Sequence, residues 1–236
     1  MNIRKHNVVR FLLGGLAIAV SFASCAAAGA DGGGSGSDNG GGGGGTPAAT
    51  EAPITEISGV ATGESDGTVE LVVAYEGPNG EETEDVASAT IAADGSFTIS
   101  PLPDLETEAP GVLDTIGQLL FDSDTVPAGF TISDSSVDAA ISTQLDVLDP
   151  SSSYVGFLIK INGTLVPPIV SVVWIYVTGD TDISGTGTLD GEPTTVDLKL
   201  KAGWNRAIVT EAGSGDPVNF YSGAEPAGLS WLLFFP

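Results

Sequence analysis

Strict alternation of apolar and polar side chains is the clearest pattern in this chain. The segments 68–76 (TVELVVAYE) and 195–201 (TVDLKLK) each place an apolar residue at almost every second position. In an extended strand, successive side chains point to opposite faces, so a period of two residues gives the strand one apolar face. Both segments are therefore predicted to be strands with one face towards a core and the other towards water.

The segment 171–178 (SVVWIYVT) has a different pattern, because it is apolar on both of its potential faces. Strands that are covered on both sides have such continuous apolar runs. We therefore predict that this segment is a central strand, and that Trp174 is buried.

Weaker strand patterns recur along the rest of the chain, separated by turns that contain Gly or Pro. The further predicted strands are 54–62, 86–92, 96–100, 140–148, 154–161, 169–178, 185–189, 204–211 and 229–235. Many short strands with frequent turn residues are typical of a β-sandwich. The predicted fold is therefore mainly β, with one or more antiparallel β-sandwiches.

One stretch predicts a short helix. Between residues 106 and 121, apolar side chains recur at helical spacing, and Pro110 falls where a first helical turn tolerates proline. The apolar positions are Val112, Leu113, Ile116, Leu119 and Leu120. We predict a single helix over 106–121.

Turn residues predict how neighbouring strands connect. Asp94-Gly95 lies between two strand patterns, which favours a tight hairpin turn because such turns need a positive φ angle. Gly77-Pro78-Asn79-Gly80 predicts another turn, followed by an acidic loop at 81–85. Ala202-Gly203 predicts a hairpin between the strands on either side of it.

The N-terminal region predicts export. Arg4, Lys5 and Arg10 precede an apolar run at 11–23, which is too short to cross a bilayer and fits a secretory signal. Phe22-Ala23-Ser24-Cys25, at the end of this run and directly after it, resemble the lipobox of bacterial lipoproteins. This resemblance implies cleavage before Cys25 and lipidation of Cys25, which anchors the protein to a membrane.

Composition divides the chain into four segments. Residues 1–24 are the predicted signal, and 25–52 hold the lipidated cysteine and a Gly-rich tether that is expected to be disordered. Residues 53–105 form a β-sandwich-like segment, and 106–236 form a C-terminal β domain. The alternative is that 53–236 form one unit.

The charge of the predicted mature chain excludes several partners. Three of the seven basic residues and none of the 31 acidic residues lie in the signal, so the mature chain has four basic residues and a formal charge of −27. Such a chain repels nucleic-acid phosphates and anionic lipid headgroups. The expected membrane contact is therefore the lipid anchor alone.

The mature chain also lacks the side chains of common catalytic mechanisms. Cys25 is the only cysteine of the chain, and the only histidine, His6, lies in the signal. A Ser-His-Asp triad, a cysteine nucleophile and a typical zinc site are therefore all excluded. Carboxylate chemistry, lysine chemistry and oxygen-ligated metals remain. Because the mature chain has no histidine, no free cysteine and no catalytic motif, we expect the protein not to be an enzyme, with a carboxylate-dependent activity as the alternative.

A second resemblance supports a non-catalytic role. Ile57-Ser58-Gly59-Val60, the segment 94–99 (DGSFTI) and Leu102-Pro103 resemble the carboxypeptidase-regulatory-like (prealbumin-like) β-sandwich of bacterial surface proteins. The resemblance implies a spacer or a binding unit.

Candidate ligand-binding residues are few. Asp180, Asp182 and Ser184 match the first half of a Ca²⁺ loop, but the closing glutamate is one position late, so a polar hairpin is favoured and no cofactor is expected. Asp122 and Asp124 form another oxygen pair.

Aromatic and basic residues form two further candidate groups. Trp174, Tyr176, Trp204, Tyr221 and Trp231 are expected to pack in a core, with a glycan-binding platform as the alternative. Lys199, Lys201 and Arg206 lie close together in sequence, where pairing with acidic residues is favoured over a docking patch.

These observations predict a cell-envelope lipoprotein with a non-catalytic β domain that acts in binding, adhesion or envelope structure. The alternative is a surface-anchored, carboxylate-dependent glycan hydrolase. The partner is expected to be an envelope protein or polysaccharide. Because Ala26 follows the lipobox cysteine, where aspartate would signal retention at the inner membrane, the outer membrane is favoured in a cell with two membranes.

The anchor gives the first testable prediction. Cys25→Ser should move the protein from the membrane fraction to the soluble fraction, or leave its precursor uncut, because acyl chains are the expected membrane attachment. Fractionation with immunoblotting measures both outcomes, and Ser24→Ala, which keeps a small residue before the cysteine, is the control. Normal processing and membrane fractionation of Cys25→Ser would contradict the lipoprotein assignment.

Overall fold

The computed structural model describes residues 51–62, 66–77, 80–123, 125–164, 166–213 and 216–235. The predicted signal, Cys25 and the tether up to residue 50 lie outside the described residues, as does Asp124. Within the described ranges, no helix is long and apolar enough to cross a membrane.

Strands make up most of the described chain, as predicted, and the mainly β fold class is confirmed. The strands are β1 (Ile57–Val60), β2 (Thr68–Gly77), β3 (Gly80–Thr90), β4 (Ser96–Ile99), β5 (Asp114–Thr115), β6 (Phe130–Ile132), β7 (Asp138–Ser142), β8 (Leu145–Leu148), β9 (Tyr154–Ile161), β10 (Ile169–Val177), β11 (Thr181–Leu189), β12 (Glu192–Leu200), β13 (Gly203–Glu211), β14 (Val218–Ser222) and β15 (Ser230–Phe234). The helices are α2 (Leu105–Glu108), the 3₁₀ turn η1 (Pro110–Val112) and α3 (Ile116–Phe121).

Most strands belong to one extensive sheet, in the order β15-β9-β8-β2-β7-β10-β13-β14-β12-β11-β6, with β3 beside β2 and β5 beside β7. β1 and β4 form a separate antiparallel pair. β12 and β14 run parallel, whereas the other described pairs are antiparallel. β2 pairs with both β7 and β8, so strands of the predicted segments 53–105 and 106–236 share this sheet.

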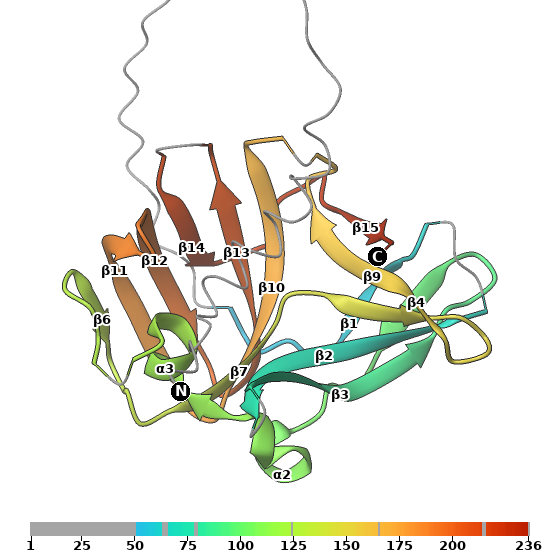
Figure 1. Ribbon diagram of the computed structural model, residues 1–236, viewed down its shortest axis with the longest axis horizontal. Coiled ribbons are helices and arrows are strands. Elements are labelled where there is room, and N and C mark those ends of the chain that lie inside the picture. The colour runs from blue at the N-terminus through green and yellow to red at the C-terminus, as the bar shows by residue number, and fades with distance from the viewer. Residues whose placement is uncertain are drawn as a thin grey trace, which may run out of the picture.

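The strand β10 lies between the two halves of the molecule and is buried on both faces (Figure 1). Its side chains divide between two hydrophobic cores: Val173, Ile175 and Val177 in one, and Val172, Trp174 and Tyr176 in the other. We call the first the helix-side core, because α3 packs in it, and the second the tryptophan core, because it holds Trp174, Trp204 and Trp231. The prediction of a central strand covered on both faces is confirmed.

The prediction of one helix over 106–121 is wrong, because the segment is broken into α2, η1, β5 and α3. Pro110 disfavours helical geometry at the residue before it, and α2 ends at Glu108. A new helix, α3, then begins after Thr115, whose hydroxyl accepts a hydrogen bond from the backbone N–H of Gln118. The apolar residues serve different cores, since Val112 packs in the tryptophan core and Ile116 in the helix-side core.

Of two predictions about the region between β2 and β4, one is wrong and the other holds only at the turn itself. The acidic segment 81–85 is part of β3, which pairs with β2 along its length. A turn does form at Asp94-Gly95, where Gly95 has a φ of 82° and its N–H donates to the carbonyl of Ala92. The N–H of Ala92 also donates to the carbonyl of Ser96 across this turn. The strand after the turn then pairs with β1 and not with β3, so the predicted hairpin does not continue beyond this hydrogen bond.

The predicted hairpin around Ala202-Gly203 does not form. β14 lies between β12 and β13 and pairs with both strands. Asn205 stabilises the connection instead, since its side chain accepts a hydrogen bond from the N–H of Lys201 and donates to the Lys201 carbonyl. The sequence pattern missed β14, in which Val218, Phe220 and Ser222 are buried at every second position.

Trp174 in β10 gives the second testable prediction. Its side chain is 3% exposed, and replacing a buried tryptophan with alanine typically costs about 3–5 kcal/mol of stability. Trp174→Ala should therefore lower the melting temperature by on the order of 10 °C or abolish cooperative unfolding. Circular dichroism melts measure this, with the half-exposed Tyr154→Ala as a control that should change the melt little. A wild-type melting curve for Trp174→Ala would overturn its role in the core.

Candidate functional site

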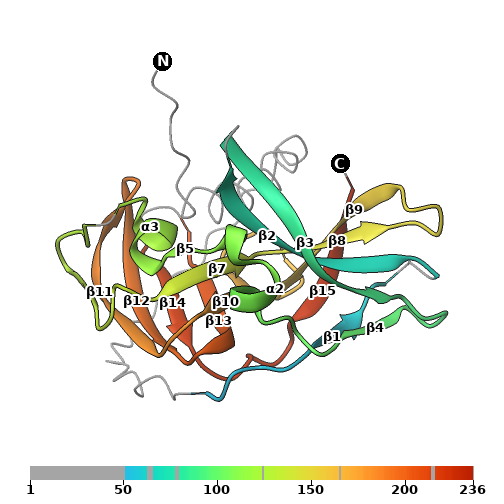
Figure 2. The same ribbon diagram turned by 90° about the horizontal axis from the view of Figure 1, so that it is seen from below.

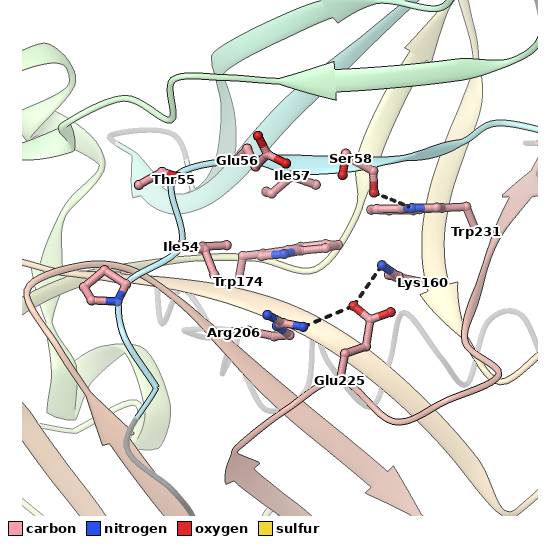
Figure 3. A pocket seen from close by; sticks show the side chains of 11 residues that line it. Ile54, Thr55, Glu56, Ile57, Ser58, Lys160, Trp174, Arg206, Glu225 and Trp231 are labelled. Carbon is pink, nitrogen blue, oxygen red and sulfur yellow. Dashed lines mark hydrogen bonds and ion pairs between the residues drawn. The ribbon is translucent and has the colours of Figure 1, made fainter.

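A pocket of about 340 Å³ opens beside the tryptophan core. One wall is the segment Pro53–Ser58, which enters β1 and which we call the strap. The other walls are side chains from β9, β10, β13, β15 and the segment before β15: Lys160, Trp174, Arg206, Trp231 and Glu225. Figure 3 shows the strap on one side of the two indoles and the three charged side chains on the other. We call this the strap pocket.

Strand register sets the positions of the indoles and the cations. Trp174 of β10 lies directly opposite Arg206 of β13, and Trp231 of β15 lies directly opposite Lys160 of β9. Directly opposed residues of antiparallel strands share a face and have adjacent Cβ atoms. Each tryptophan is thus paired with a cation by the sheet itself, and Lys160 Nζ lies 5.5 Å from the centroid of the Trp231 ring.

The two indoles form a rigid floor. Their ring centroids are 5.3 Å apart and the ring planes differ by 9°, an offset stack that aromatic pairs favour. Trp174 is 3% exposed and Trp231 5% exposed, so most of their surface is buried. The prediction that they pack in a core is confirmed for both.

The strap is held against Trp231 at close range. The indole Nε1 of Trp231 donates a hydrogen bond to the backbone carbonyl of Ser58 at 3.2 Å. A Cβ atom at Gly59 would lie 1.9 Å from the same nitrogen, so only glycine fits at this position without moving the indole. The backbone N–H of Ile54 also donates to the carbonyl of Trp204, which fixes the other end of the strap.

An ion-pair network lines the pocket. Lys160 Nζ lies 2.8 Å from Glu225 Oε2, and Arg206 Nη1 lies 3.3 Å from the same oxygen. Arg206 also lies 3.7 Å from a carboxylate oxygen of Glu51, at the start of the described chain. The side chains of Lys160, Arg206 and Glu225 are 17%, 24% and 27% exposed, so water reaches them only in part. Two of the four cations of the predicted mature chain therefore meet in one pocket.

These groups equip the pocket for polar recognition. Lys160 and Arg206 have several N–H donors, and Glu225 supplies acceptors. Thr55 and Ser58 also line the pocket, and their hydroxyls can donate or accept a hydrogen bond. The described residues contain no group of three or more His, Cys, Asp or Glu side chains placed to hold a metal ion. The arrangement can bind a small polar ligand without a metal.

A second pocket of about 410 Å³ lies across the strap and shares Pro53, Ile54 and Thr55 with the first. Within it the Tyr176 hydroxyl donates a hydrogen bond to Asp104. Burial, followed by this hydrogen bond, raises the pKa of Tyr176 to about 12, so the phenol stays protonated at neutral pH. Trp204 Nε1 donates to the Pro103 carbonyl at 2.8 Å. These bonds attach the 101–106 segment to β10 and β13, which is a structural role.

A carboxylate cluster lies elsewhere, on three neighbouring strands. Glu70 of β2 lies directly opposite Asp146 of β8, and Asp85 of β3 is close to Glu70. Burial raises the pKa of Glu70, and the negative charges of Asp85 and Asp146 raise it further. Burial also raises the pKa of Asp146, against a hydrogen bond that its carboxylate accepts from Gln144. None of the three residues lines either pocket.

The calcium candidates do not lie together with this cluster. Asp180 accepts hydrogen bonds from Lys201 Nζ at 2.7 Å and from the backbone N–H of Ala202, which lower its pKa, the lysine being the main cause. Asp182 and Ser184 follow on the exposed face of β11, in extended conformation. Calcium binding there stays the less favoured alternative to a polar hairpin. Asp122 ends α3 in the left-handed conformation and accepts a hydrogen bond from Gln118.

Sequence reasoning missed part of the site. It grouped Lys199, Lys201 and Arg206, but only Arg206 lines the strap pocket, whereas Lys201 pairs with Asp180. Lys160 and Glu225 were not predicted. The scarcity of cations was a usable signal, because each cation of such an acidic chain is expected to find a carboxylate.

The carboxylate cluster gives the third testable prediction. Because folding raises the pKa of Glu70, its charged form destabilises the fold, and this destabilisation is absent at low pH and appears as pH rises through the raised pKa. Glu70→Gln should therefore raise the melting temperature by a few degrees at pH 7 and much less at pH 4. Calorimetric melts at both pH values measure this, and the exposed Glu76→Gln on the same strand is the control. An equal effect at both pH values, or a lower melting temperature at pH 7, would contradict it.

Comparisons with protein-family models, with characterised proteins and with solved structures found no significant match for this chain.

Proposed function

We propose that this chain is a lipid-anchored protein of the cell envelope, and that its β domain binds an envelope component without catalysis. The outer membrane is the proposed location in a cell with two membranes. The observation that supports a binding role best is the strap pocket, a partly enclosed space with a rigid indole floor and a charged, hydrogen-bonding wall. Pockets with a few convergent polar groups on a preformed scaffold are the usual form of small-ligand sites.

Two features favour binding over catalysis. The predicted mature chain has no histidine, and its only cysteine, Cys25, is the expected lipidation site and keeps no thiol, so proton transfer would fall to carboxyls or lysines. In the strap pocket, Glu225 forms ion pairs with both Lys160 and Arg206. This arrangement holds the charged wall in position, which suits ligand binding better than proton transfer by Glu225.

The alternative is a surface-anchored glycan hydrolase that uses two carboxylates. Glu56 and Glu225 both line the strap pocket, and a pair of carboxyls on either side of a glycosidic bond is the usual catalytic arrangement of such enzymes. The binding experiment described below separates the two functions, provided that the polysaccharide is also analysed for cleavage afterwards.

Binding gives the fourth testable prediction. The protein, extracted in a detergent without sugar headgroups, should sediment with purified envelope polysaccharide of the producing cell. Thr55→Trp should reduce the bound fraction at least tenfold, because a bulky side chain at this exposed rim position, which the strap pocket shares with the second pocket, obstructs the opening while all ion pairs are kept.

Thr188→Trp is the matched control, since Thr188 is exposed on β11 and does not line the pocket. Equal binding by both variants would overturn the strap pocket as the binding site. New reducing ends in the polysaccharide, lost in Glu225→Gln, would replace the proposal with the hydrolase.

A further inference from the structure

The charge of the strap pocket is balanced, although the chain as a whole is strongly acidic. Among the lining residues, Lys160 and Arg206 bring two positive charges and Glu56 and Glu225 bring two negative charges. Glu51 does not line the pocket, although it lies 3.7 Å from Arg206. An anionic ligand would meet Glu225 between the two cations, and a cationic ligand would meet Lys160 and Arg206. Removing a charged ligand from water without a net opposite charge is unfavourable. The charge balance therefore favours a ligand without net charge.

Donors and acceptors alternate along the charged wall. Both cations contact the same oxygen of Glu225, Oε2, and within the described residues Oε1 has no ion-pair or hydrogen-bond partner. Oε1 is thus an acceptor next to the N–H donors of Arg206 and Lys160. Thr55 and Ser58 line the pocket from the strap, on the other side of the two indoles (Figure 3). A hydroxyl group can donate to a carboxylate and accept from a guanidinium or ammonium at once. Several neighbouring hydroxyls on one ligand would match this wall.

The indole floor limits the size and shape of the ligand. Trp174 and Trp231 expose little surface, so they offer a narrow apolar strip and not an open platform for a chain of stacked rings. A volume of about 340 Å³ is at the small end of ligand pockets, which begin at about 300 Å³. A single ring with an apolar C–H face and hydroxyls at its edge fits both walls.

We propose that the strap pocket binds one uncharged sugar residue, with its hydroxyls on Glu225, Arg206 and Lys160 and its C–H face towards the indoles. This inference rests on the proposed binding function and names its ligand class. The sugar can be free or a unit of a polysaccharide, because the recognised groups are the same.

The test uses the full protein in a detergent without sugar headgroups and four probes: glucose, N-acetylglucosamine, glucuronate and glucosamine. Isothermal titration calorimetry should give a dissociation constant on the order of 1 mM for at least one of the two neutral sugars, as expected for a ligand of this size. The anionic glucuronate and the cationic glucosamine should each bind at least fivefold more weakly. An oligosaccharide that contains the preferred sugar should bind more tightly than the free sugar if the ligand is a polysaccharide unit, and no more tightly if it is free.

Glu225→Gln should weaken binding of the neutral sugar at least tenfold, because it removes the carboxylate acceptor. Glu192→Gln is the matched control, since Glu192 is exposed on β12 and does not line the pocket. Glu225→Gln could also lose binding because it unfolds. Thr55→Trp tests the same site with the ion pairs intact, so lost binding in Thr55→Trp together with a wild-type melting curve for that variant shows that the loss comes from the pocket and not from unfolding.

Tighter binding of glucuronate or glucosamine, no binding of either neutral sugar, or full binding by Thr55→Trp would overturn the sugar assignment. If sedimentation with envelope polysaccharide still depends on Thr55, only the ligand class is wrong. If sedimentation with the polysaccharide does not depend on Thr55 either, the proposed binding function of the strap pocket is wrong as well as the sugar assignment.

Discussion

The burial of both faces of β10 is the constraint on which the rest of the structure depends. A strand with six apolar side chains in succession, Val172–Val177, has no face that can be left in water, because exposed apolar surface costs about 25 cal/mol per Å². One layer on each side of the strand is therefore needed. The helix-side core supplies one and the tryptophan core the other, and the neighbouring strands β7 and β13 also divide their side chains between the two. The two halves in Figure 1 are thus the two coverings of one strand.

The strap pocket is a consequence of how the tryptophan core is closed. Figure 2 shows the β1–β4 pair alongside β15, away from the large group of strands that covers the other face of β10. Trp231 packs edge-on against Phe97 of β4, stacks on Trp174 of β10 and bonds to the strap. Three chain segments far apart in sequence therefore meet at one indole. The cations enter this place by strand register, and a carboxylate from the segment before β15 holds them there.

The sequence allowed the elements of the fold to be predicted better than their partners. Alternation located β2 and β12, and the apolar run located β10 and its two covered faces, because these patterns are local. Pairing is decided by distant residues, so the insertion of β14 between β12 and β13 could not be read from the Ala202-Gly203 turn. The helix failed for a related reason, since the spacing from Val112 to Leu120 fits one stripe although these residues serve two cores. The site was missed because Lys160 and Glu225 are brought together only by the pairing register of β9 with β15 and by their ion pair, neither of which has a local sequence pattern.

The overall charge of the chain and the charge inside the strap pocket act over different distances. At physiological ionic strength, interactions between exposed charges are largely screened beyond about 8 Å. The acidic surface therefore governs the approach of large polyanions and cations, whereas a ligand in the pocket responds to the few groups it touches. Those groups are partly buried and screened less, so their local balance decides the choice of ligand. The Glu70 cluster illustrates the opposite case. Burial, and then the negative charges of Asp85 and Asp146, raise the pKa of Glu70 and leave the fold less stable when Glu70 is charged. In such an acidic chain, placing two of the scarce cations beside two tryptophans forms a pocket wall in which a carboxylate has cationic partners, so its polar contacts are made without this repulsion.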